Sequence, residues 1–297
     1  NYTHSFHPYP AKFPAKVIRS YIEKYSKPGE YILDPFCGSG TTLVESRLLG
    51  RNSLGIDINP VGVLISKVKS EYYTEEDIET LGLIVKSLEN ALTEPEKWIN
   101  KHQNVACLPD YQNRGHWFKD IVVTELSSIK SGIINQYEKS NPKVYRLLLA
   151  AFSRIVVLVS NQDTETRYAR VEKDINVGDT LHLFLKTTKS YQKILGNNNI
   201  LPLTSKVDVI EGDTLKELPK IDSDSFDLVI TSPPYINSFD YYLYHKHRIF
   251  LLNKSPQLVR EIEIGGHHTI DAQSYAVAYE NYYTAMKKTF ENLHRIL

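Results

Sequence analysis

The chain has 297 residues, of which 41% are hydrophobic and 24% charged, and its formal net charge is zero. This length is enough to bury one large core, or a core that carries an insert. No apolar run approaches the ~20 residues of a membrane helix, and two cysteines provide neither a disulfide framework nor zinc-ligand spacing. A reducing cytoplasm is the expected location. A strongly basic chain would have favoured nucleic-acid binding, and a neutral charge does not.

The first 70 residues alternate between strand and helix patterns. An irregular arm rich in proline and aromatic residues covers 4–14. After it we expect a helix over 16–25, a strand over 31–34, a helix over about 41–49 closed by Gly50, a strand over 53–57, and a helix opened by Pro60. Such alternation at short spacing predicts a parallel sheet with crossover helices.

The strand pattern resumes only at 207–210 and 227–231, after about 150 residues that read mostly as helix. The expected helices cover 74–92, 118–137, 142–159 and 179–195, the first beginning with a capping box of Thr74 and Asp77 and the last closed by Gly196. We interpret residues 71–205 as a mainly helical insert in a doubly wound, Rossmann-like α/β domain formed by 1–70 and 206–297. Two independent domains are the alternative, disfavoured because the sheet pattern resumes.

The last predicted helix, about 271–297, is followed by no strand. Only four parallel strands are therefore expected, and the apolar strand 227–231 would form an uncovered edge, which folded proteins avoid. We expect a C-terminal segment or a second chain to complete the sheet.

A turn rich in glycine follows the first strand. It reads Asp34-Pro35-Phe36-Cys37-Gly38-Ser39-Gly40 and leads directly into a helix N-terminus, where backbone N–H groups attract an anion. Asp57 ends the second strand about 20 residues on, a spacing at which acids bind ribose hydroxyls. The turn lacks the Gly-Lys-Ser/Thr ending of a nucleotide P-loop and departs from the dinucleotide fingerprint. A tight turn without a ligand is the alternative.

A second motif, Thr231-Ser232-Pro233-Pro234-Tyr235, follows the last strand, at the edge where open α/β sheets bind ligands. An exocyclic amino group is a poor nucleophile because its lone pair is delocalised into the ring. Ser232 Oγ and the Pro233 carbonyl are suitable acceptors for its hydrogens, since two prolines make a rigid frame without N–H groups. Tyr235 offers a face on which a base stacks. No set of metal ligands is expected.

The two motifs together resemble those of the DNA amino-methyltransferases, which use S-adenosylmethionine (AdoMet) to methylate cytosine N4 or adenine N6. Residues 55–59, with Asp57 and Ile58, resemble the family's ribose-binding motif. Residues 211–214, with Asp213 and Thr214, resemble the motif beside the adenine ring. The arm 7–14, with Lys12 and Phe13, is similar to the segment that closes over the methionine end. Packing of this arm on the core is the alternative.

The resemblance implies a double-stranded DNA substrate, a flipped-out base and in-line methyl transfer, in a bacterial or archaeal restriction-modification setting. In this family Ser-Pro-Pro-Tyr is more typical of the enzymes that methylate cytosine N4. The long gap between the motifs resembles members that place target recognition there. Stretches 113–118 and 160–168 are similar to an insert of predicted DNA methylases. Four polar residues are candidates for DNA contact or for a helix cap: Asn161, Asp163, Arg167 and Arg170.

Three other functions stay open: an N6-adenine DNA enzyme, a transfer-RNA guanine-N2 methylase, and a catalytically silent DNA-binding subunit. Two basic clusters either meet phosphate or form a solvated face. They are Arg167 with Arg170 and Lys173, and His245 with Lys246, His247 and Arg248. Tyr241, Tyr242 and Tyr244 either line the base pocket or pack as an amphipathic run.

Overall fold

The computed structural model describes residues 2–197, 204–237, 240–271 and 274–297, and these form two compact units. The sheet unit consists of Ala11–Glu71, Ile200–His245 and Ser255–Leu297. The helical unit consists of Asn1–Pro10, Tyr72–Asn199 and Lys246–Lys254. Each unit is therefore assembled from three separate stretches of chain.

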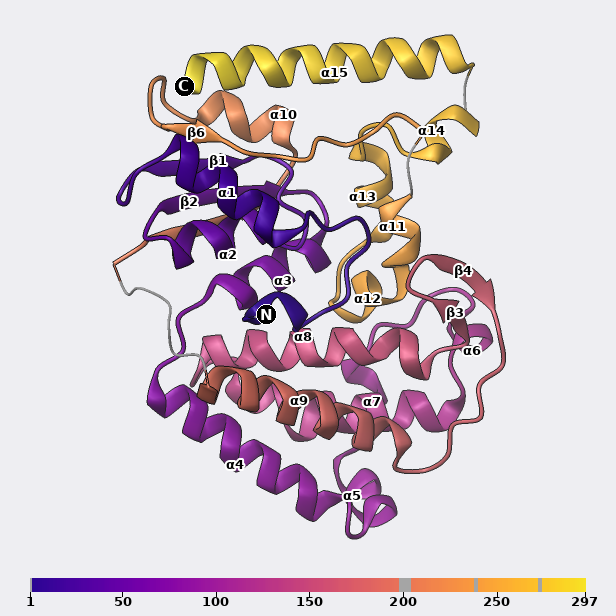
Figure 1. Ribbon diagram of the computed structural model, residues 1–297. Coiled ribbons are helices and arrows are strands. Elements are labelled where there is room, and N and C mark those ends of the chain that lie inside the picture. The colour runs from indigo at the N-terminus through magenta and orange to yellow at the C-terminus, as the bar shows by residue number, and fades with distance from the viewer. Residues whose placement is uncertain (1, 198–203, 238–239, 272–273) are drawn as a thin grey trace. The chain divides into compact units, whose positions relative to one another are not determined.

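The sheet unit contains four parallel strands in the order β5-β2-β1-β6 among the described residues (Figure 1). The strands are β1 (Tyr31–Asp34), β2 (Asn52–Asp57), β5 (Val207–Glu211) and β6 (Leu228–Val229). Asp34 pairs with Gly55, Leu33 with Val229, and Asp57 with Glu211. This register brings all four carboxyl ends to one edge of the sheet, and it confirms the predicted α/β class with a parallel sheet.

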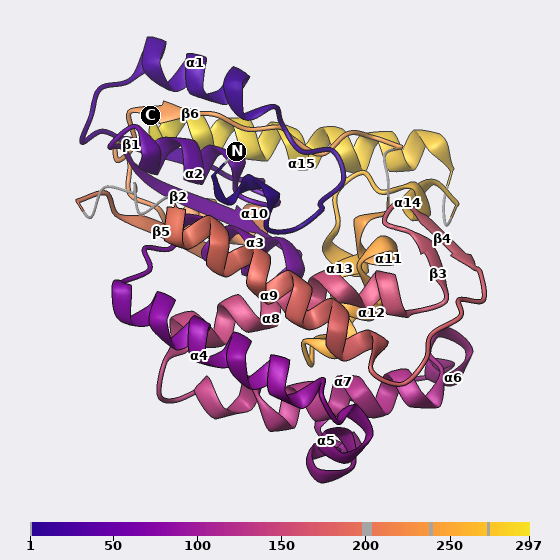
Figure 2. The same ribbon diagram turned by 60° about the horizontal axis from the view of Figure 1, so that its bottom comes forward.

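Alternation along β1 determines which helices cover which face. Successive strand residues point to opposite faces. Ile32 packs with Ile18 and Ile22 of α1 (Ala15–Tyr25), whereas Leu33 packs in the cluster that contains Ile296 of α15 (Tyr275–Ile296). Helices thus cover both faces of the central strand, as a parallel sheet requires (Figure 2). The other helices of this unit are α2 (Thr41–Leu48), α3 (Pro60–Ser70), α10 (Thr214–Glu217), α11 (Tyr241–Tyr244), α13 (Pro256–Ile262) and α14 (His267–Asp271).

Strand β6 is shorter than expected and lies at an edge of the described sheet. Backbone hydrogen bonds continue on both sides of it, from Asp227 N to Tyr31 O and from Ile230 N to Leu33 O. Completion of the sheet by further chain stays a prediction. The last helix was expected from about residue 271, but α15 begins at Tyr275, and residues 272–273 of the expected span lie outside the described part.

The helical unit is built around α8 (Pro142–Val159), which is buried along most of its length. The predicted capping box is confirmed, because Asp77 N donates to Thr74 Oγ1 and Thr74 N to Asp77 Oδ2. Gly196 does not close its helix, which runs on to Asn197. The other elements are α4 (Glu75–Ala91), α5 (Pro95–His102), α6 (Arg114–Trp117), α7 (Asp120–Gly132), β3 (Gln162–Thr164), β4 (Arg167–Arg170), α9 (Asp179–Asn197) and α12 (Lys246–Leu251).

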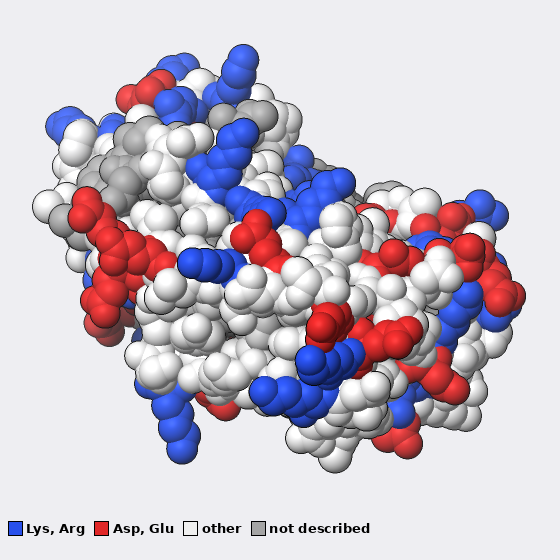
Figure 3. All heavy atoms as spheres, turned by 90° about the horizontal axis from the view of Figure 1, so that it is seen from below, with Lys and Arg blue, Asp and Glu red and all other residues white. Residues whose placement is uncertain are grey.

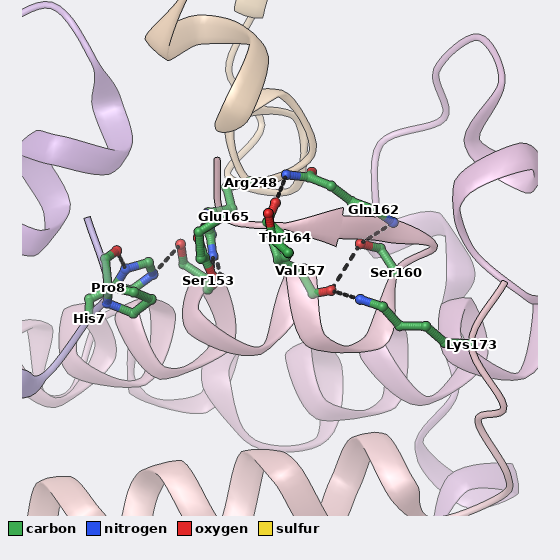
Figure 4. Close-up of polar contacts among 10 residues, drawn as sticks. All are labelled: His7, Pro8, Ser153, Val157, Ser160, Gln162, Thr164, Glu165, Lys173 and Arg248. Carbon is green, nitrogen blue, oxygen red and sulfur yellow. Dashed lines mark hydrogen bonds and ion pairs between the residues drawn. The ribbon is translucent and has the colours of Figure 1, made fainter. Parts of the chain in front are cut away.

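A buried arginine joins α12 to the β3–β4 hairpin, which the sequence did not lead us to expect. Arg248 Nε donates to Ser153 O at 2.8 Å, and its guanidinium pairs with both carboxylate oxygens of Glu165 at 2.7 Å (Figure 4). In the same region Lys173 Nζ donates to Val157 O at 2.5 Å. His245, His247 and Arg248 are all buried, so both interpretations of that basic cluster, phosphate contact and solvated face, are wrong for these three.

Charge is not segregated on the face of the molecule in Figure 3, where basic and acidic side chains lie beside one another. This agrees with a formal net charge of zero. Within the described residues, no helix combines the length and the apolar character that a membrane crossing requires.

We expect Arg248→Met to lower the free energy of unfolding by about 3 kcal/mol, because it leaves the Glu165 carboxylate and the Ser153 carbonyl without their buried donor. Urea denaturation followed by circular dichroism measures this change. The matched control is Arg167→Met, which breaks an arginine–carboxylate pair with Asp163 whose arginine side chain is 73% exposed. That change should cost less than about 1 kcal/mol. Equal losses in the two variants would contradict the structural role of Arg248.

Candidate active site at the carboxyl edge of the sheet

The turn after β1 is held in a fixed shape by hydrogen bonds from its backbone to β2. Gly38 N donates to Asp57 Oδ2 at 2.7 Å, and Cys37 N donates to Ile56 O at 3.0 Å. Gly40 has φ +74°, and a Cβ there would lie 2.8 Å from Ser66 Oγ, so only glycine fits. Helix α2 begins directly after Gly40 without a side-chain cap. Its first N–H groups are therefore suited to an anionic ligand.

Helix α3 supports the same turn from behind, through residues that the sequence did not single out. Ser66 Oγ donates to Gly38 O at 2.8 Å, and the fully buried Lys69 donates through Nζ to Ser39 O at 2.8 Å. Burial, and then the charge of Lys12, lower the pKa of Lys69 to about 7. Lys12 of the arm therefore lies close enough to affect a group that holds the turn.

Two carboxyl groups end the adjacent strands β1 and β2. Asp34 is buried, and Asp57 is half-buried and also accepts from Asn59 N at 2.8 Å. Burial raises the pKa of each from 3.8 to about 6, and hydrogen bonds only partly offset this effect. Because both folded-state pKa values exceed the ordinary one, the two groups favour folding most below pH ~4. That contribution is lost as the pH rises through 6.

A hydrogen bond connects the two sequence motifs directly. Thr231 Oγ1 donates to Asp34 Oδ1 at 2.7 Å, and the same oxygen accepts from Phe36 N at 3.3 Å. Strands β1 and β6 are parallel neighbours, so Asp34 and Thr231 leave the sheet side by side. Ser232 to Tyr235 thus begin next to the glycine-rich turn, although about 200 residues separate the motifs in sequence.

The loop after Thr231 is held on its far side by α15. Tyr282 Oη donates to Pro234 O at 2.9 Å. Ser232, Pro233 and Pro234 are half-buried, whereas Tyr235 is 62% exposed and presents its ring to solvent. The loop therefore combines a fixed backbone with an accessible aromatic face.

This arrangement can be compared with known proteins. The family model described as DNA methylase matches residues 1–68. A Type II methyltransferase of Kocuria varians, M.MvaI, is 31% identical over 251 residues, which are 80% of this chain and 54% of the relative. The Type II methyltransferase M.BsoBI of Geobacillus stearothermophilus is 26% identical over 280 residues, covering 87% of this chain and 54% of the relative. M.MjaII of Methanocaldococcus jannaschii is 40% identical over 96 residues, 32% of this chain and 18% of the relative.

The chain belongs to the N6/N4 family of DNA amino-methyltransferases. It spans about half the length of the first two of these relatives. No solved structure matches it. The family relationship confirms the resemblance that the two motifs indicated.

The remaining residues that the family's cofactor motifs indicate lie around the same edge. Asp213 caps α10 by accepting from Leu215 N at 3.0 Å, and Thr214 Oγ1 donates to Pro35 O at 2.6 Å, so Thr214 braces the turn. Ile58 directly follows Asp57, and Lys12 and Phe13 are exposed on the arm. The structure thus gives Thr214 an intramolecular contact, and the assignment of ligand contacts to these residues stays a prediction.

The residues that were candidates for DNA contact differ in accessibility. Asn161 is buried, and it binds the 113–118 stretch: its N–H donates to Trp117 O at 2.7 Å. Asp163 pairs with Arg167 at 3.1 Å, and Arg170 Nε donates to His116 O at 3.1 Å. Only the two arginines keep substantial exposure, with side chains 73% and 41% exposed.

Sequence reasoning missed a polar cluster that follows the motif Ser232 to Tyr235. Asp240, Glu263 and His268 place one carboxylate or imidazole atom each within 4.8 Å of one another. Burial, and then the nearby Asp240 carboxylate, raise the pKa of Glu263 from 4.5 to about 8. Its one sequence signal was the unusual Gly265-Gly266-His267-His268 stretch, which matches none of the motifs considered.

Thr231→Val removes the hydroxyl that links the two motifs and should lower the free energy of unfolding by about 1–2 kcal/mol, because Asp34 loses a buried donor. A double-mutant cycle with Asp34→Asn, measured by urea denaturation, should give a coupling of about 1 kcal/mol. The control is Thr289→Val, whose buried hydroxyl bonds only to Ala285 O of its own helix. A coupling near zero would show that the link contributes nothing.

Proposed function

We propose that this chain carries the AdoMet-binding and catalytic residues of a site-specific DNA methyltransferase that acts on the exocyclic amino group of a flipped-out base, cytosine N4 by preference. The observation that supports this most is the hydrogen bond between Thr231 and Asp34. It joins a turn suited to a nucleoside cofactor to a loop suited to a planar base that bears an amino group. Neither motif alone would define both halves of a methyl transfer.

The residues at the edge fit the chemical groups of AdoMet. The uncapped N-terminus of α2, after Gly38, Ser39 and Gly40, would hold the methionine carboxylate. Asp57 accepts one backbone N–H on each oxygen and keeps acceptor capacity for ribose hydroxyls. The other proposed contacts come from the loops around these groups: Asp34, Pro35, Phe36, Cys37, Ile58, Asp213, Thr214, Lys12 and Phe13.

The loop would activate the amino group by positioning and electrostatics. Ser232 Oγ and the Pro233 carbonyl accept the amino hydrogens, which frees the nitrogen lone pair for attack. The carbonyl of Pro234 is already bound by Tyr282, so this contact holds the frame rather than the substrate. Tyr235 stacks on the base. AdoMet, when bound, would supply an electrophilic methyl group, whose bond to sulfur would break as the bond to nitrogen forms, and the amino proton released would pass to water.

The helical residues 71–205 are proposed to take part in target recognition within the double-stranded DNA substrate. Arg167 and Arg170 on the hairpin strand β4 are the candidates for phosphate contact. The setting would be the cytoplasm of a bacterium or archaeon with a restriction-modification system, in keeping with the Type II methyltransferase names of the relatives. Adenine N6 is the alternative target, and transfer RNA and a silent subunit are the more distant ones.

The test of this proposal is nucleoside mass spectrometry on DNA from cells that express the protein with its natural flanking sequence. N4-methylcytosine should accumulate, and Ser232→Ala should reduce it at least 100-fold because the amino group loses an acceptor. Ser20→Ala, on the exposed surface of α1, is the matched control and should leave the level unchanged.

Each other result has a definite meaning. N6-methyladenine would support the same mechanism with adenine, in place of cytosine, as the target base. Unmodified DNA together with methylated guanine in transfer RNA would show that the substrate is transfer RNA and not DNA. AdoMet binding without any methylated product would indicate a silent subunit and overturn the proposal.

Cofactor affinity should depend on pH through Asp57. The ribose contact needs the carboxylate, and the pKa of Asp57 in the free protein is raised to about 6. Affinity should therefore weaken about tenfold between pH 7.5 and pH 5 and be constant above pH 7. Isothermal titration calorimetry with AdoMet measures this. Asp57→Asn should bind more weakly at pH 7.5 and lose most of the dependence, and an unchanged profile in that variant would exclude Asp57 as the ribose ligand.

A further inference from the structure

The segment Gly265–His268 lies against three described residues that end or follow the motif Ser232 to Tyr235, namely Tyr235, Asn237 and Asp240. A Cβ on Gly265 would lie 2.9 Å from Tyr235 O, so this glycine allows the two backbones to meet. His267 Nδ1 lies 2.6 Å from Asn237 Oδ1, and His268 contacts Asp240 through both its backbone and its ring. The segment is therefore shaped to the part of the loop that carries Tyr235.

The ring of His268 has acceptors at both nitrogens. Nε2 lies 3.0 Å from Arg260 O, a carbonyl that can only accept, so this nitrogen carries a hydrogen. Nδ1 lies 2.7 Å from Asp240 Oδ1, which also accepts the backbone N–H of His268 at 3.0 Å. A carboxylate at Asp240 can only accept, and a ring that donates from both nitrogens to two such acceptors is an imidazolium. A Cβ on Gly266 would lie 2.7 Å from His268 Cε1, so a larger residue there would displace the ring.

A second acid lies beside this pair. Glu263 Oε1 accepts from Tyr241 N at 3.0 Å, and Oε2, which has no hydrogen-bond partner among the described residues, lies 4.0 Å from His268 Nδ1. The side chains of Glu263 and His268 are 8% and 12% exposed, so their charges are poorly screened. The charged and titratable groups around Glu263 are Asp240, His268, Tyr242, Arg260 and, further away, Asp57.

We propose that His268 is a positioning residue: its imidazolium pairs with Asp240 beside Glu263 and thereby fixes the catalytic loop in the form that receives the base. This inference rests on the proposed function for its effect on methylation, but the protonation of the ring can be measured without it. Among the described residues, the hydrogen bonds and ion pairs that His268 makes go to Asp240, Arg260 and Glu263, and none goes to the glycine-rich turn. Loss of the charge should therefore change turnover and leave cofactor affinity intact.

The experiment compares His268→Gln with His294→Gln, an exposed histidine on α15, in the full-length enzyme. His268→Gln should lower kcat about 10- to 100-fold, with the AdoMet Kd within about twofold of the parent, and Asp240→Asn should do the same. His294→Gln should change neither quantity. Nitrogen-15 NMR of labelled histidine, assigned through the His268→Gln variant, should show both ring nitrogens protonated at pH 7.

Four results would overturn the inference: an unchanged kcat in His268→Gln, an equal loss of AdoMet affinity, a neutral ring at pH 7, or one divalent metal ion per chain that is lost on His268→Gln. Metal analysis of the purified protein tests the last, because the same three side chains could hold such an ion. If the parent enzyme methylates no nucleic acid, the proposed function fails. The NMR result still decides whether His268 is paired as stated.

Discussion

The site depends on one constraint, the parallel pairing of β1 with β6 and the hydrogen bond between Asp34 and Thr231 at the end of that pair. Strand pairing brings two distant parts of the chain to one edge, and the hydrogen bond fixes the direction in which each leaves it. Burial of Asp34 strengthens this bond, because water has little access to the carboxylate. The turn on one side and the loop on the other are then positioned by contacts local to each: Ser66 and Lys69 for the turn, Tyr282 for the loop.

The sequence was sufficient for the elements whose signals are local. The strands Tyr31–Asp34 and Val207–Glu211, the helix Pro142–Val159 and the capping box at Thr74 follow from periodicity and from residues within one turn of the chain. The parallel sheet followed from the alternation of these signals. We expected four parallel strands with 227–231 at an edge, and among the described residues β6 does lie at the edge of a four-stranded sheet.

What the sequence did not provide depends on contacts over long separations. Lys69 resembles a solvent-exposed residue of an amphipathic helix until the turn carbonyl that it binds is known. Arg248 was misinterpreted for the same reason, since its partner Glu165 lies 83 positions away. The cluster around His268 lacks any recognised spacing, because the atoms that meet there come from two segments joined only by folding. Buried polar residues were thus the consistent source of error.

The division of the helical unit into three stretches of chain has a consequence for inheritance. Residues 1–10 and 246–254 belong to this unit, and in sequence they are separated from its long central stretch by segments of the sheet unit. A recombination event that replaced only the long central stretch would separate Glu165 from the Arg248 with which it pairs. Exchange of this unit between relatives therefore requires three segments to be transferred together. Selection should keep them as one linked set, diverging at a common pace.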